Sequence, residues 1–151
     1  MTMPPEQAIE TTHDALARAM AGDVRGGAEL LGPLIADGGR TAYALAAMLA
    51  ETASIIARRE QQPDTFFVTI VENAVTGESG SIEELPPDIQ FASQFTTAWA
   101  NRDQDTAIAL FVALVKKSEP SEGAELVDGL LALFQTAVAT AQAACTQGRP
   151  S

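Results

Sequence analysis

The sequence predicts an all-α fold: a single domain of six to seven helices that form a helical bundle or two stacked three-helix units. Alanine, the best helix former, occurs 28 times in the 151 residues. Aromatic residues make up 5% of the chain, and runs of β-branched residues with the alternation of a strand are nearly absent. An alanine-rich chain with few aromatic residues is typical of helices packed closely on helices.

The first two predicted helices cover residues 5–21 and 24–36. Pro4-Pro5 opens the first helix, because a proline at the first helical position loses no hydrogen bond. Gly22-Asp23 ends it. The second helix stops at Asp37-Gly38-Gly39, since glycine favours the left-handed conformation that closes a helix.

The third predicted helix covers residues 40–60 and the fourth residues 64–75. Pro63-Asp64 supplies a stop and a cap before the fourth, so its apolar segment 66–71 is interpreted as helix although its residues also suit a strand. A turn follows over residues 76–81. Spacings of three and four predict that one face of the third helix is buried against a neighbour: Ala42, Leu45, Leu49, Thr52 and Ile56.

Three more helices are predicted over residues 87–100, 104–117 and 122–147. The segment 106–115 is apolar all round, so we expect its helix to be the central and most buried one. The last helix carries an apolar seam with coiled-coil spacing, which predicts a buried or self-associating face. The seam consists of Val127, Leu131, Phe134, Val138, Ala141 and Cys145.

The two halves of the chain are weakly similar, which predicts an internal duplication within one domain of residues 1–151. Residues 20–31 match 99–110 at an offset of 79, and after a three-residue insertion residues 42–49 fall opposite 124–131. The alternative is that two alanine-rich helical hairpins align by chance. The expected halves are residues 5–61 and 87–147, joined by residues 62–86.

The net charge of -11 excludes binding of nucleic acid through a general phosphate-neutralising surface. With 46% apolar residues, disorder of the whole chain is not expected. Residues 129–148 carry no charge over 20 positions, but their glutamines and threonines favour a buried or amphipathic helix over a membrane span. The absence of a signal-peptide pattern and the single cysteine lead us to expect a cytoplasmic protein with no membrane contact.

No residue pattern predicts catalysis, a metal or a cofactor. Glu10 and His13 have the spacing that di-iron helical bundles use, but such sites need two of these motifs and the chain has one histidine. We therefore expect His13 to be half-buried and locally hydrogen-bonded. Cys145 lies on the apolar seam, where a thiol is usually inert. The sequence thus favours a protein that is not an enzyme.

The middle of the chain is strongly acidic. Residues 60–101 contain seven acids and no lysine, arginine or histidine. If they form one face, its field would attract a basic partner; the alternative is a solvated surface that keeps the protein soluble. The candidate partner-binding residues are Glu72, Glu78, Glu83, Glu84 and Asp88.

The same region holds most of the large aromatic residues. Phe91, Phe95 and Trp99 are four residues apart, so they share one face of a helix. We expect them to anchor the core. If any of them, or Phe66 or Phe67, is exposed beside the acids, it would mark a binding patch.

Three functions are compatible with these patterns. The leading hypothesis is a non-enzymatic protein that mediates protein–protein interaction or regulation, with a basic protein or a second copy of the chain as partner. Self-association into a homodimer would use the seam residues Val127, Leu131, Phe134 and Val138. The alternatives are an acidic decoy that covers the basic surface of a nucleic-acid-binding protein, and a helical pocket for a small apolar or cationic ligand.

Overall fold

Six α-helices dominate the part of the chain that the computed structural model describes, residues 3–55, 71–72, 79–80 and 85–147. The predicted all-α fold is confirmed. A short 3₁₀ helix, η2 (Glu119–Ser121), precedes the last helix, and β1 (Val71–Glu72) pairs antiparallel with β2 (Ser79–Gly80). The helices are α1 (Pro5–Met20), α2 (Val24–Ala36), α3 (Gly39–Ala53), α5 (Pro87–Ala100), α6 (Gln104–Ser118) and α7 (Ala124–Gln147).

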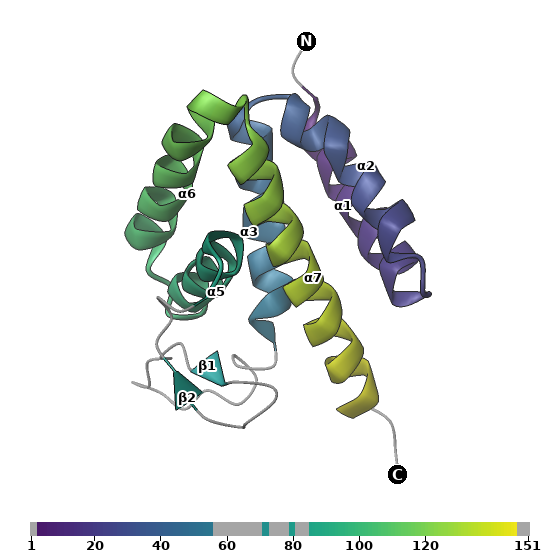
Figure 1. Ribbon diagram of the computed structural model, residues 1–151. Coiled ribbons are helices and arrows are strands. Elements are labelled where there is room, and N and C mark those ends of the chain that lie inside the picture. The colour runs from purple at the N-terminus through teal and green to yellow at the C-terminus, as the bar shows by residue number, and fades with distance from the viewer. Residues whose placement is uncertain (1–2, 56–70, 73–78, 81–84, 148–151) are drawn as a thin grey trace.

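Helices α3 and α7 lie side by side at the centre, and a helical hairpin packs on each side of them (Figure 1). The α1–α2 hairpin lies on one side and the α5–α6 hairpin on the other. Each central helix therefore contacts helices from both hairpins. The six helices thus form one helical bundle, which is one of the two arrangements that the sequence predicts.

The two central helices bury the same pattern of positions. In each helix three adjacent pairs of buried residues are spaced four apart, which is the spacing of a continuous helix stripe. The burial patterns match at an offset of 88, whereas the alignment of the two sequence halves has an offset of 82. The stripes are Thr41, Ala42, Leu45, Ala46, Leu49 and Ala50 in α3, and Gly129, Leu130, Leu133, Phe134, Ala137 and Val138 in α7.

The two hairpins turn in the same way. After α1, the amide of Asp23 donates to the carbonyl of Arg18 at 2.9 Å; after α5, the amide of Asp103 donates to the carbonyl of Ala98 at 2.9 Å. Both aspartates then cap the next helix through a side-chain oxygen. The matching bonds fix the offset of the hairpins at 80, one more than predicted.

Glycine lets the α1–α2 hairpin close tightly. A Cβ atom on Gly27 would lie 2.4 Å from the backbone oxygen of Ala15 in α1 and 3.1 Å from Cζ of Phe134 in α7. Three helices therefore meet at a point where no side chain fits. At the equivalent position of the other hairpin, α6 carries Ala107, which is also buried.

Aromatic rings fill the space between α3 and the α5–α6 hairpin. Tyr43 contacts Phe111 and Phe95 edge-on, with ring centroids 5.3 and 6.2 Å apart. Trp99 stacks on Phe95 and donates a 2.7 Å hydrogen bond from Nε1 to Glu51. Phe91 and Phe95 are buried and Trp99 is partly buried, so the prediction that this stripe anchors the core is confirmed. Phe66 and Phe67 lie outside the described residues.

The structure corrects two predictions of burial. Helix α6 is not the central helix: it buries one face, while Ile108 and Val112 on the other are 46% and 43% exposed. His13 is exposed, because α1 turns Ala8, Thr12 and Ala15 toward the core instead. An all-apolar segment does not distinguish a central helix from a peripheral one with apolar residues on its outer face.

Three predicted boundaries also differ. Helix α3 ends at Ala53, where the prediction continues to residue 60, although residues 56–60 lie outside the described part. Of the predicted helix 64–75, only residues 71 and 72 are described, and they form a strand with 79 and 80, so that helix is wrong there. Helix α7 begins at Ala124 because Glu122 and Gly123 have positive φ angles, which end the preceding turn.

Asp37 ties the start of the chain to the α2–α3 connection. Its carboxylate accepts hydrogen bonds from the amide of Met3 at 3.0 Å and from the hydroxyl of Thr41 at 2.5 Å. These bonds, that of Thr41 first, hold the pKa of Asp37 below its ordinary value. The carboxylate is thus favoured in its charged form in the folded chain.

We predict that Gly27→Ala destabilises the protein by about 1–3 kcal/mol, because the added methyl group meets a backbone oxygen that cannot move alone. Gly32→Ala on the same helix is the matched control: its Cβ would meet no atom, so the lower entropy of the unfolded chain should stabilise the protein by about 0.5–1 kcal/mol. Urea denaturation measures both. Equal effects of the two substitutions would contradict the close approach at Gly27.

We predict that Asp37 stabilises the fold in a pH-dependent manner. Because its folded pKa is lowered, the stabilisation is complete above the unfolded pKa of about 3.9 and is lost as the pH falls through the folded value. Asp37→Asn should therefore lower the Tm at neutral pH, and the difference from wild type should shrink toward about pH 2.5. Thermal unfolding across this range tests it; a constant difference would contradict the role assigned to the carboxylate.

Candidate functional site

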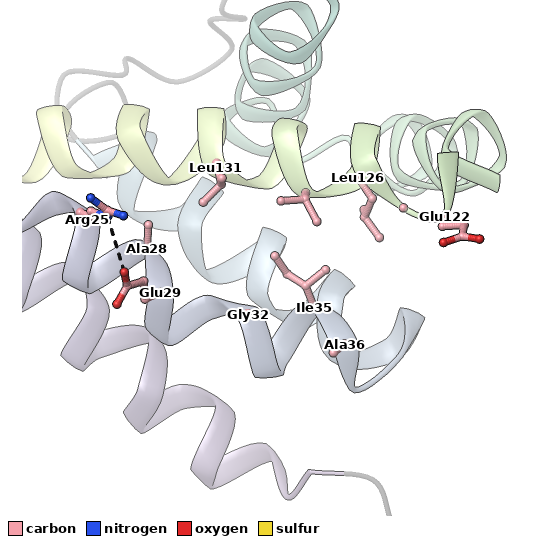
Figure 2. A pocket seen from close by; sticks show the side chains of 11 residues that line it. Arg25, Ala28, Glu29, Gly32, Ile35, Ala36, Glu122, Leu126 and Leu131 are labelled. Carbon is pink, nitrogen blue, oxygen red and sulfur yellow. Dashed lines mark ion pairs between the residues drawn. The ribbon is translucent and has the colours of Figure 1, made fainter. Parts of the chain in front are cut away.

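The candidate site is an apolar groove between α2 and α7, shown in Figure 2. Its volume is about 510 Å³. The two helices run in opposite directions, so that Arg25 lies at the end near Leu131, and Ala36 lies at the end near Glu122. The remaining lining residues are Ala28, Glu29, Gly32, Ile35, Gly123, Leu126 and Val127.

Small residues on α2 create the groove. Ala28, Gly32 and Ala36 are spaced four apart and form one stripe along the helix. A Cβ atom on Gly32 would meet nothing within 4 Å. Helix α7 faces this stripe with larger apolar side chains, Leu126, Val127 and Leu131. The result is a hollow with an apolar floor that is open to solvent.

Charged residues mark the two ends of the groove. Arg25 lies 3.6 Å from Glu29, but both side chains are largely exposed, so this ion pair contributes little stability. At the opposite end Glu122 follows η2 in the left-handed conformation. The groove thus has a basic group at one end, where Arg25 lies, and an acidic group at the other.

The structure divides the predicted self-association seam. Phe134 and Val138 are buried inside the chain, so they are not available to a partner in this structure. Val127 is 37% exposed and Leu131 is partly exposed, and both line the groove. The heptad-like spacing does not distinguish the buried pair from the pair that lines the groove, because all four residues lie on the same apolar side of α7. Of the remaining seam residues, Ala141 is partly buried and Cys145 is exposed.

The predicted acidic face is described only in part. Glu78, Glu83 and Glu84 lie outside the described residues, and Glu72 lies in β1. Asp88 is partly exposed on α5, beside a hollow that Lys117 and residues of α7 also line. The described acids are spread over all six helices rather than gathered on one surface.

The α2 side of the groove is the part that sequence reasoning missed. Ala28, Gly32 and Ala36 are not conspicuous in the sequence, because small residues are common throughout this alanine-rich chain. Their spacing of four is a usable signal, because small residues in that pattern leave a shallow face on a helix. The spacing does not indicate which helix packs against this shallow face.

A second hollow of about 480 Å³ lies between the start of α1 and α3. It is lined by two methionines, Met3 and Met48, but by no aromatic residue. Within the described part of the chain, no group of three or more histidine, cysteine, aspartate or glutamate residues is placed to hold a metal ion. The groove between α2 and α7 is therefore the site with the clearest geometry.

Comparison of the chain with protein-family models, curated proteins and solved structures finds no match. Helix α7 is long and apolar enough between Ala124 and Cys145 to cross a membrane by length and composition. In the structure it packs between the two hairpins, and core helices commonly have such a composition. The groove between α2 and α7 is therefore the feature of this chain that points to a function.

We predict that Phe134→Ala costs about 3–5 kcal/mol of unfolding free energy, because it leaves a cavity where α1, α2 and α7 meet. Val127→Ala, on the same predicted seam, should change it by less than about 1 kcal/mol. Chemical denaturation of both variants tests the division of the seam. Similar losses would show that Val127 belongs to the core.

Proposed function

We propose that this chain is a non-enzymatic protein–protein interaction module whose groove between α2 and α7 docks an amphipathic helix of a partner. The observation that carries the proposal is the shape and lining of the groove: an open apolar hollow between two helices with a charge at each end. Amphipathic helices bind such hollows by placing residues spaced three or four apart into them.

The size and chemistry of the groove favour a helix over a small molecule. It is open to solvent, and its charged groups are few: the exposed pair Arg25 and Glu29 toward one end, and Glu122 at the other. Small-ligand sites are usually more enclosed and direct several polar groups at one point. An exposed apolar surface that runs between two helices is typical of an interface.

The test uses a photo-crosslinking amino acid, p-benzoyl-phenylalanine, at position 29 of the full chain, in extract of the native host. Position 29 is suited to it because Glu29 lines the groove with a largely exposed side chain, so that a crosslinker there lies beside the groove without filling it. We expect crosslinks to a segment with apolar residues spaced three or four apart. Excess unlabelled wild type should compete, whereas excess Gly32→Gln, in which the groove is filled, should not.

The matched control carries the crosslinker at Ala17, which is exposed on α1 and does not line the groove. Products seen from position 29 should be absent from position 17. The same products from both positions, or none from position 29, would overturn the proposal.

A further inference from the structure

One side of α6, beside its buried face, carries large apolar side chains that are exposed in the described chain. Ile108 and Val112 are 46% and 43% exposed, and Val115 next to them is partly buried against the core. These three residues lie on one side of the helix, next to the face that holds its buried residues Ala107, Phe111 and Leu114. Exposed large apolar side chains that follow each other along one helix mark an interface. We call these three residues the α6 stripe.

The α6 stripe and the groove occupy equivalent positions of the two hairpins. At the offset of 80 that the turns fix, Ile108, Val112 and Val115 correspond to Ala28, Gly32 and Ile35. At the first two of these positions α2 has the small residues Ala28 and Gly32 and a hollow, whereas α6 has Ile108 and Val112, which form a ridge. The two surfaces therefore differ in shape in a complementary way.

The charges beside these surfaces are complementary as well. Asp105 and Lys116 flank the α6 stripe, and they are eleven residues apart, about 16 Å along a helix. The two ends of the groove are marked on α2 by Arg25 and Ala36, which are also eleven residues apart. Glu122 lies at the same end of the groove as Ala36. A helix laid parallel to α2 would therefore bring Lys116 to Glu122, and Asp105 to the end where Arg25 is paired with Glu29. The reversed orientation would place Asp105 beside Glu122 and would lose the pairing of Lys116 with that carboxylate.

We propose that the helix that docks in the groove is α6 of a second copy of this chain, parallel to α2, with Ile108 and Val112 inserted beside Gly32. This inference rests on the proposed function, since it names the occupant of the same groove. The groove and α6 lie on opposite sides of the molecule (Figure 1). Two copies cannot exchange these contacts reciprocally, so the copies associate head to tail.

The net charge of -11 works against this association, because two copies repel each other over the range of the Debye length, about 8 Å at physiological salt. Local charge complementarity at the contact offsets part of this repulsion, and the ends of the groove offer it. The assembly is therefore weak and depends on concentration.

The test blocks the two surfaces separately. Val112→Gln removes the centre of the α6 stripe, and Gly32→Gln fills the groove. Ala113→Gln is the control on the same helix, since Ala113 is exposed but points away from the α6 stripe. Sedimentation velocity of the purified full chain at physiological salt, from about 10 µM to about 1 mM, gives the mass of the assembly.

We expect wild type and Ala113→Gln to gain mass with concentration, and each blocked variant to weaken the association at least tenfold. A mixture of the two blocked variants still has one intact groove and one intact α6 stripe. It should therefore form a dimer that does not grow further, an outcome that only head-to-tail contact explains.

Charge reversal tests the orientation. Arg25→Asp and Asp105→Arg should each weaken association, because each places like charges together. Their mixture should restore it, since every contact between the two variants again joins opposite charges. Circular dichroism confirms that the variants are folded. No loss from either reversal would overturn the parallel arrangement.

A wild-type chain that stays monomeric at about 1 mM, or one whose association neither Val112→Gln nor Gly32→Gln weakens, would overturn the inference. The proposed function is separable from it. If the crosslinker at position 29 still captures a helix of another protein, the groove is a docking site and only the second copy is excluded. If it captures nothing, both proposals fail.

Discussion

The contact between α3 and α7 is the constraint on which the rest of the structure depends. Each helix buries three adjacent pairs of residues against its neighbours, and small residues such as Ala42, Ala46 and Ala137 let the helices approach. Neither hairpin has a core of its own. Each gains one by covering a side of this central pair, which is why the burial of apolar surface is shared among all six helices.

The two hairpins that cover the central helices α3 and α7 turn in the same way, but different side chains fill the space beneath them. On the side of α1 and α2, Gly27 lets three helices meet over Phe134. On the other side the space is wider and aromatic: Tyr43, Phe95 and Phe111 pack edge-on, and Trp99 reaches Glu51. The difference extends to the surface. Small residues on α2 leave a groove beside α7, whereas α6 presents large apolar residues at the equivalent positions.

This asymmetry connects the fold to the proposed function. A repeated unit with identical residues in both halves would have two grooves or two ridges, and neither would complement the other. Here one half has the hollow and the other the ridge, with charges of opposite sign at matching separations. Shape and charge together define an orientation, which an apolar surface alone does not.

Local signals in the sequence determined most of the helices. The starts of α1, α2, α5 and α6 were predicted correctly, and in the structure Pro5 and Pro87 open α1 and α5 while Asp23 and Asp103 cap α2 and α6. Caps and stops act within a few residues of the chain, so they can be found without the tertiary structure. The alanine content determined the all-α class. The positive φ angles of Glu122 and Gly123 were not apparent from the sequence, and the predicted start of α7 is therefore two residues early.

Only the tertiary structure decided which apolar faces are covered. The seam on α7 has one spacing throughout, yet Phe134 is buried and Val127 is exposed, because the α1–α2 hairpin covers the first and diverges from the second. For the same reason an all-apolar α6 is peripheral and His13 is exposed. Helix periodicity is a property of one segment, whereas burial depends on what lies opposite it. The candidate groove arises from residues about 100 positions apart, and their approach is fixed by the packing of both hairpins on α3 and α7.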